Sequence, residues 1–313
     1  MNDFGRQSEP FLFILDFELD KPVLLPIKNV NPAEIYFDIH GFTNLNVKYP
    51  PLSQADFQKF PIKLDQYRHA FEEVLNHIHL GNTYLLNLTF KTKIQTKLSL
   101  PEIFELSNAP YKLLYKDQFV VFSPEAFVKI ESKTISSYPM KGTIDAGIED
   151  AETVLLNDSK ELAEHNTIVD LIRNDLSMVS KNVRVEKFRY IDKIKTHEKE
   201  LLQTSSKICG DLPSDWKERI GEILITMVPA GSVSGAPKKK TVEIIKEVEN
   251  FDRGYFTGIF GYFDGQKLDS AVMIRFIEKS GEELCFKSGG GITSFSNCES
   301  EYWEMVDKVY LPI

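Results

Sequence analysis

Strand-like runs that follow one another through tight turns, with no helix between them, most constrain the fold of this 313-residue chain. A β-hairpin is predicted near the C-terminus: its strands are residues 258–263 and 268–277, and its turn is the Asp264-Gly265 pair. A second turn at Ser280-Gly281 leads into residues 283–287 and extends the hairpin to an antiparallel meander. A Rossmann sheet would alternate strands with helices, so we predict an α+β fold instead.

Three segments of the chain have the apolar spacing of helices. Residues 64–80 carry apolar side chains at steps of three and four, and they end before Gly81, a common helix stop. A segment that begins near Ser159 and a last segment that opens at Ser296 show the same spacing. Both of these also open with a capping signature, which predicts where each helix begins.

Strands are predicted outside the meander as well. Residues 83–90 alternate between apolar and polar side chains, as a half-buried strand does. Residues 119–122 and 127–130 are apolar runs, and the connection between them carries Glu125. We therefore expect Glu125 on a tight connection rather than on an open helix face.

Composition limits the possible partners and the compartment. The net charge of −9, without a basic stripe, argues against nucleic-acid binding. No apolar run approaches the roughly 18 residues of a membrane span, and the polar first ten residues lead us to expect no signal peptide. The cysteines lack metal-ligand spacing and predict reduced thiols in a cytoplasmic protein: Cys209, Cys285 and Cys298. We predict a short β-rich segment, residues 1–60, packed on the same core as a main domain, residues 61–313.

The helix from Ser159 carries two carboxylates on one side. Glu161 and Glu164 are three residues apart, so their side chains can converge. Glu161 also fits a structural role, because it stands at the third position of a cap that begins at Asp158. Glu164 has no such structural explanation.

The last helix repeats this arrangement. Its apolar side contains Tyr302, whereas Glu301, Glu304 and Lys308 are predicted on the opposite stripe. An exposed Glu304–Lys308 pair is the structural interpretation, and spacing alone favours it. The functional alternative is that two acidic helices supply oxygen ligands to Mg²⁺.

Two further segments contain proline or glycine residues that give the backbone special properties. Lys141 stands between Pro139 and Gly142, in a stiff segment that we expect at the end of a sheet. Residues 288–292 contain three consecutive glycines, whose N–H groups could hold a carboxylate; a plain tight turn is equally compatible with them. The glycine-rich residues 229–238 lack the spacing of a phosphate loop, so we reject an ATP site.

Taken in order, these motifs resemble the chorismate-utilising enzyme family, which includes anthranilate, aminodeoxychorismate and isochorismate synthases. Six segments carry the resemblance: PMKGT (139–143), ELAEHNTIVDLIRND (161–175), PAGSVSGAPK (229–238), RGYFTGIFGY (253–262), MIRF (273–276) and SGGGITSFSNCESEYWEM (288–305). The resemblance implies an anthranilate-synthase-like fold, in which two layered, mainly antiparallel sheets are flanked by helices and the active site lies between the halves.

Lys141 points to one branch of the family. Members that make anthranilate or isochorismate typically carry Ala at this position of PMKGT, so the chain is similar to component I of aminodeoxychorismate synthase. That branch makes 4-amino-4-deoxychorismate from chorismate and ammonia, on the route to p-aminobenzoate and folate. No glutaminase signature occurs, so the ammonia would come free from solution or from a separate glutamine amidotransferase subunit. The alternatives are anthranilate synthase component I and a catalytically impaired homologue that acts as a binding subunit.

The resemblance also implies roles for individual residues. Lys141 would form a covalent adduct with the substrate, and Glu125 would protonate the departing hydroxyl. Mg²⁺ would be held by Glu164 and Glu304, with Glu161 and Glu301 acting directly or through water. The implied substrate-binding residues are Arg275, Gly289, Gly290, Gly291, Lys308, Ser232, Thr143 and Asn87.

Three positions depart from the family pattern. Leu85 stands where relatives commonly have Gln, or Lys in the isochorismate branch, and the missing Lys argues against an isochorismate synthase. Gln203 stands where a family His is expected, and Phe256 where many relatives have Tyr. We expect all three changes to affect the substrate pocket.

Overall fold

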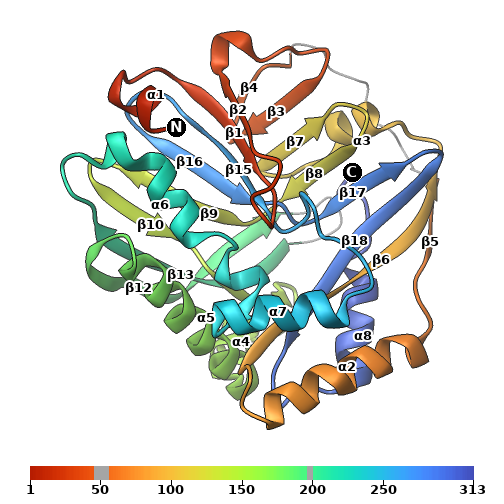
Figure 1. Cartoon of the computed structure of the whole chain (residues 1–313). Helices are drawn as coiled ribbons and strands as arrows, with labels where there is room; N and C mark the ends of the chain where they lie inside the picture. Colours follow the sequence, from red (N-terminus) through yellow and green to blue (C-terminus); the bar gives the residue numbers. More distant parts are fainter. Residues whose placement is uncertain (46–55, 196–199) are drawn as a thin grey trace. The chain divides into compact units, whose positions relative to one another are not determined.

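The computed structural model describes residues 1–45, 56–195 and 200–313 of the chain (Figure 1). The strands form two nine-stranded sheets, and helices complete an α+β fold, as predicted. The chain divides into two compact units. Unit 1 comprises Met1–Pro10, Glu125–Ser232 and Tyr262–Ser270; unit 2 comprises Phe11–Pro124, Val233–Gly261 and Ala271–Ile313. The predicted division between residues 60 and 61 stays a prediction.

Unit 1 is built on antiparallel strands with two helices against them. One edge of β13 pairs with β12, and the other edge pairs with β11 and β10, which in turn pairs with β9. Helices α4 and α5 lie against β11 and β13. The elements are α1 (Asn2–Arg6), β9 (Ala126–Glu131), β10 (Thr134–Ser137), β11 (Met140–Asp145), α4 (Ala151–Asn157), α5 (Ser159–Ser177), β12 (Lys181–Lys195), β13 (Glu200–Asp211), η2 (Trp216–Arg219) and α6 (Ile220–Met227).

Unit 2 contains the whole of one nine-stranded sheet, in the order β14-β6-β18-β17-β8-β7-β3-β4, with β5 also paired to β6. Its elements are β1 (Phe11–Leu15), β2 (Val23–Pro26), η1 (Ile27–Asn29), β3 (Ile35–Ile39), β4 (Phe42–Thr43), β5 (Phe57–Phe60), α2 (Leu64–His79), β6 (Leu85–Thr96), α3 (Leu100–Leu106), β7 (Tyr111–Tyr115), β8 (Phe119–Ser123), β14 (Gly235–Ala236), α7 (Lys238–Val248), β17 (Phe276–Ser280), β18 (Glu283–Ile292) and α8 (Cys298–Asp307). Three elements have residues in both units: η3 (Gly231–Val233), β15 (Ile259–Phe263) and β16 (Leu268–Val272).

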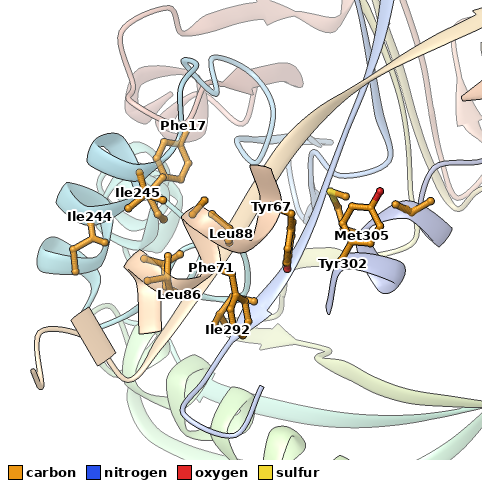
Figure 2. Packing of buried hydrophobic residues seen from close by; sticks show 14 residues of the cluster. Phe17, Tyr67, Phe71, Leu86, Leu88, Ile244, Ile245, Ile292, Tyr302 and Met305 are labelled. Carbon is orange, nitrogen blue, oxygen red and sulfur yellow. The ribbon is translucent and has the colours of Figure 1, made fainter. Parts of the chain in front are cut away.

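The core of unit 2 explains why α2, α7 and α8 form where they do. Figure 2 shows their apolar side chains meeting those of β6 and β18. Tyr67 and Phe71 come from α2, as the helical spacing predicts, and both are buried. Met305 of α8 and Leu88 of β6 are completely buried in the same cluster. Burying each such side chain contributes on the order of 1.5–3 kcal/mol, so this core holds the three helices on the sheet.

The predicted meander near the C-terminus is only partly right. The hairpin of β15 and β16 forms, but the second strand ends at Val272 rather than at Ile277. Arg275 has a positive φ of 53°, which interrupts the strand. Strand β17 then joins the other sheet, next to β18 and β8. The strand-like pattern of residues 268–277 did not reveal this break.

Candidate functional site

Lys141 lies inside strand β11, opposite Thr204 of β13. The stiff segment that we expected at the end of a sheet is thus a strand, and β11 stands first in the strand order of its sheet. Gly142 has a φ of 71°, a backbone conformation that glycine adopts without strain, and the pairing register shifts between Lys141 and Thr143. The Nζ atom of Lys141 donates a hydrogen bond to Glu164 Oε2 at 3.1 Å, and the two side chains are 34% and 29% exposed. The bulged strand thus presents an amine to the first half of α5.

Glu161 reaches the same place from the start of α5. A Cβ atom added at Gly142 would lie 3.0 Å from Glu161 Oε2, so the absence of a side chain makes room for this carboxylate. Asp158 caps the helix, as predicted, by accepting a hydrogen bond from the Glu161 N–H at 2.9 Å. The structure therefore brings Lys141, Glu161 and Glu164 together.

Thr143 points away from this group. It pairs with Gln203 of β13, and the Gln203 amide donates to the Thr143 hydroxyl at 3.3 Å. Gln203 and Thr204 are consecutive in β13, so their side chains face opposite sides of the sheet, and paired residues share a face. The bulge thus separates Lys141 from Thr143, and the substrate-binding role of Thr143 stays a prediction.

Glu125 and Ser232 meet although they are 107 positions apart. Glu125 lies between β8 and β9, on the tight connection predicted for it. The Ser232 hydroxyl donates to Glu125 Oε1 at 2.6 Å, which orients the carboxyl group. The next residue back, Gly231, donates its N–H to Asp175 Oδ2 at 3.1 Å, so Asp175 of α5 helps to hold this segment.

The second acidic pair lies on α8 in unit 2. Lys308 Nζ donates to Glu304 Oε1 at 2.7 Å and to the carbonyl oxygen of Gly289 at 2.8 Å. Glu301 is only 4% exposed, so its prediction on an exposed stripe is wrong. The helix cap is Asn297 rather than Ser296, because the Asn297 side chain accepts from the first N–H groups of α8.

The three glycines of residues 289–291 lie within β18, opposite Thr89, Leu88 and Asn87 of β6. The tight turn that was one interpretation of these glycines is therefore wrong. A Cβ atom added at Gly290 would lie 3.3 Å from Glu301 Oε2 and 3.8 Å from both Glu304 Oε1 and Lys308 Nζ. Each unit thus contains an acidic pair on a helix, close to a strand glycine.

Tyr67 adds a polar group beside the second acidic pair. Its side chain is buried, and its hydroxyl has no hydrogen-bond partner among the residues that the structure describes. Burial raises the pKa of Tyr67 above its usual value, and the negative charge of Glu301 and Glu304 adds to the effect. A place with negative charge and an unpartnered buried hydroxyl suits a cation and its bound water.

The four glutamates are the residue type that Mg²⁺ prefers, because hard cations bind oxygen ligands. They come as one pair in each unit, namely Glu161 with Glu164 and Glu301 with Glu304. Within the described part of the chain, no three His, Cys, Asp or Glu side chains are arranged together as a metal site. That the two pairs share one Mg²⁺ ion stays a prediction.

The remaining predicted binding residues belong to unit 2. Arg275 lies between β16 and β17, and its guanidinium group lies 5.4 Å from the ring centroid of Tyr310. Its buried Nε atom has no hydrogen-bond partner among the described residues, so a ligand carboxylate could accept from it. The Asn87 carbonyl oxygen accepts from the buried Arg253 at 2.7 Å.

His165 is a residue near Lys141 that the sequence pattern did not single out. It is completely buried on α5, and its Nε2 atom lies 2.6 Å from the Ser206 hydroxyl oxygen. Burial lowers the pKa of His165 to about 4, and the positive charges of Arg189 and Lys141 contribute to the shift. Helical spacing puts His165 on the buried face of α5, so no sequence signal separates it from its apolar neighbours.

The departures from the family pattern have defined surroundings. Phe256 is 2% exposed and packs edge-on against Phe276, with ring centroids 5.8 Å apart. Leu85 begins β6, and its Cδ1 atom lies 3.0 Å from where a Cβ atom would stand at Gly291. Leu85 thus places an apolar methyl group beside the glycine run, where a polar side chain was expected from the resemblance.

No helix within the described residues is long and apolar enough to span a bilayer.

Comparisons with known proteins identify the family. A family model described as chorismate binding enzyme matches residues 30–312. A Haemophilus influenzae protein named "Uncharacterized PabA-like protein" is 53% identical over 312 residues, which cover 100% of this chain and 95% of that protein.

Two further relatives have more specific names. Aminodeoxychorismate synthase component 1 of Bacillus subtilis is 31% identical over 265 residues, which cover 80% of this chain and 55% of the relative. The crystal structure of anthranilate synthase component I from Streptococcus pneumoniae superposes with a TM-score of 0.66 at 25% identity, covering 82% of this chain and 59% of that one. This likeness confirms the predicted anthranilate-synthase-like fold. The chain therefore belongs to the chorismate-binding enzyme family, of the type that includes anthranilate and aminodeoxychorismate synthases.

Proposed function

We propose that this chain is component I of an aminodeoxychorismate synthase, which aminates chorismate at C4. The observation that carries the proposal is the placement of Lys141, a lysine at the family's branch-specific position, on a bulged strand 3.1 Å from Glu164. A nucleophilic lysine needs a neighbour that can take its proton, and Glu164 is within reach for that transfer. The Bacillus subtilis relative of this name supports the same assignment.

In the first half of the reaction, the neutral amine of Lys141 attacks C2 of the chorismate ring. A bond forms between Nζ and C2, the two ring double bonds shift to C1=C6 and C4=C5, and the C4–O bond breaks. Glu125 gives its proton to the departing hydroxyl, which leaves as water, and the lysine nitrogen releases a proton. The hydrogen bond from Ser232 at 2.6 Å orients the Glu125 carboxyl group for this step.

In the second half, ammonia attacks C4 and the double bonds return to C1=C2 and C5=C6. The bond between C2 and Lys141 breaks, the lysine nitrogen recovers a proton, and the ammonia nitrogen loses one. The sum is chorismate plus ammonia giving 4-amino-4-deoxychorismate plus water. We propose that a separate glutamine amidotransferase subunit supplies the ammonia.

Binding of a dianionic substrate to a chain of net charge −9 needs local positive charge. Arg275 and Lys308 supply it for the chorismate carboxylates, with the backbone of residues 289–291 and the side chains of Ser232 and Asn87 assisting. When bound, Mg²⁺ would neutralise a carboxylate of the substrate, and Glu164 and Glu304, supported by Glu161 and Glu301, would hold it.

The test is the product that the purified protein forms from chorismate, ammonium and Mg²⁺, identified by mass. Formation of 4-amino-4-deoxychorismate is the expected result. Anthranilate as the product would replace the proposal with anthranilate synthase. Chorismate binding without turnover, even with the amidotransferase subunit present, would identify a binding subunit instead.

A further inference from the structure

A buried ion pair outside the proposed catalytic residues joins several segments of unit 2. Arg253 and Glu249 are four residues apart after α7, and each side chain is only 1% exposed. The guanidinium group donates from Nε to Glu249 Oε2 at 2.8 Å and from Nη2 to Glu249 Oε1 at 2.6 Å. This is the two-bond geometry that arginine forms best with a carboxylate.

The remaining donors of Arg253 hold two separate segments of backbone. Nη2 donates to the carbonyl oxygen of Asn87 at 2.7 Å, and Nη1 donates to the carbonyl oxygen of Val233 at 2.7 Å. A longer contact of 3.3 Å joins Nη1 to the Thr257 hydroxyl. All five N–H groups of the guanidinium are therefore used, which a lysine with three donors could not reproduce.

Glu249 holds β6 from its own side. Its Oε1 atom accepts from the Thr89 N–H at 2.9 Å and from the Thr89 hydroxyl at 2.8 Å. The pair thus grips β6 at Asn87 and at Thr89, and these residues lie opposite Gly291 and Gly289 of β18. The glycine run, residues 289–291, lies beside Glu301 and Glu304. It pairs with the segment of β6 that Arg253 and Glu249 hold.

Stability alone does not explain such a pair. Replacing a buried ion pair with apolar side chains of similar volume is often neutral or stabilising, because two charges no longer have to be desolvated. What the pair supplies, and apolar side chains cannot, is a set of directional bonds to three backbone groups. We infer that Arg253 and Glu249 are positioning residues, which set the place of Asn87, of Val233 next to Ser232, and of the glycine run for chorismate binding.

The inference rests on the proposed function only in taking chorismate as the substrate. The decisive variant is the apolar double substitution E249L/R253M, measured for thermal stability, chorismate affinity by calorimetry, and kcat/KM. We expect a lower Tm, because the Asn87 and Val233 carbonyl oxygens and the Thr89 N–H lose their partners. We also expect kcat/KM, measured at a temperature at which the variant is folded, to fall by about a hundredfold, as displaced binding groups would cause. A folded double variant with wild-type affinity and kcat/KM would show that the pair is only structural.

The single variant R253K keeps the fold-stabilising charge opposite Glu249 but cannot make all the bonds. It should also lose chorismate affinity, and it decides the question if the double variant does not fold; wild-type affinity in R253K would then overturn the inference. The matched control is D38L/K112M, which removes another shielded pair of unit 2, with 3.9 Å between Lys112 Nζ and Asp38 Oδ2. It should leave kcat/KM unchanged. A wrong proposed function would appear in the wild-type product, whereas a wrong positioning role would appear in the variants' affinities.

Discussion

Lys141 Nζ lies 3.1 Å from Glu164 Oε2, so the proposed nucleophile touches a proposed metal ligand. The contact joins β11 to α5 across 23 positions of the chain. It depends on the bulge at Gly142, which turns Lys141 toward α5 while Thr143 faces the other side of the sheet. Because the two groups form an ion pair, a change at either one should affect the other.

Replacing Lys141 with Ala should abolish formation of 4-amino-4-deoxychorismate. Loss of a covalent nucleophile should lower kcat by roughly three orders of magnitude or more. The measurement is product formation from chorismate and ammonium, together with intact-mass detection of a substrate adduct on the wild-type protein. Lys129→Ala is the control, because Lys129 of unit 1 forms an ion pair with Asp269 at 3.0 Å and has no proposed role in the reaction. Wild-type turnover in Lys141→Ala would refute the covalent mechanism.

Glu304→Gln should weaken Mg²⁺ binding, because the neutral amide removes one negative charge from the proposed ligand set. Loss of a ligand charge should lower affinity by about tenfold or more, a factor that corresponds to about 1.4 kcal/mol. Calorimetric titration with Mg²⁺, in the presence of chorismate, measures this directly. Glu299→Gln on the same helix is the control, since its side chain is 68% exposed and lies 3.7 Å from Arg68. An unchanged Mg²⁺ affinity in Glu304→Gln would remove it from the metal site.

Tyr67→Phe should raise the free energy of unfolding and weaken binding of the cation proposed beside Glu301 and Glu304. The Tyr67 hydroxyl is buried without a partner among the described residues, and an unsatisfied buried polar group costs about 1–3 kcal/mol. Denaturant unfolding should therefore show a higher midpoint for the variant. Tyr36→Phe in strand β3 is a control outside the acidic site. A lower midpoint in Tyr67→Phe would mean that the hydroxyl is satisfied in solution.

Much of this architecture could be predicted from local patterns. The helix of α2 follows from the spacing of Tyr67, Phe71 and Val74, and its end follows from Gly81. The tight connection at Glu125 follows from two apolar runs only four residues apart. These features depend on neighbouring residues, so periodicity and turn chemistry are enough to reveal them.

Features that depend on distant partners could not be predicted in this way. Residues 289–291 resemble a turn in isolation, and only their pairing with β6 makes them a strand. Glu301 appears exposed from helical spacing, yet packing of α8 on β18 buries it. The break after Val272 is likewise invisible locally, because β16 and β17 differ in their distant pairing partners and join different sheets.

Removing the Asp158 side chain should loosen the acidic end of α5. Its carboxylate accepts a hydrogen bond from the Glu161 N–H at 2.9 Å, and replacing such a cap with Ala costs about 1 kcal/mol. Asp158→Ala should therefore lower the unfolding free energy by that amount. Asp170→Ala is the matched control on the same helix, because its ion pair with Arg173 is exposed, with side chains 73% and 49% accessible, and should change stability by less than about 0.5 kcal/mol.

The Asp158→Ala substitution should also affect the reaction, because it changes the position of Glu161. Fraying of the first turn of α5 would displace Glu161 from its place over Gly142 and weaken Mg²⁺ binding, while the contact of Lys141 with Glu164, one turn further along, would persist. Titration with Mg²⁺ under conditions where both variants are fully folded measures this effect. Equal Mg²⁺ affinities for Asp158→Ala and Asp170→Ala would show that Glu161 does not need the cap, and that its part in metal binding is negligible or independent of the helix end.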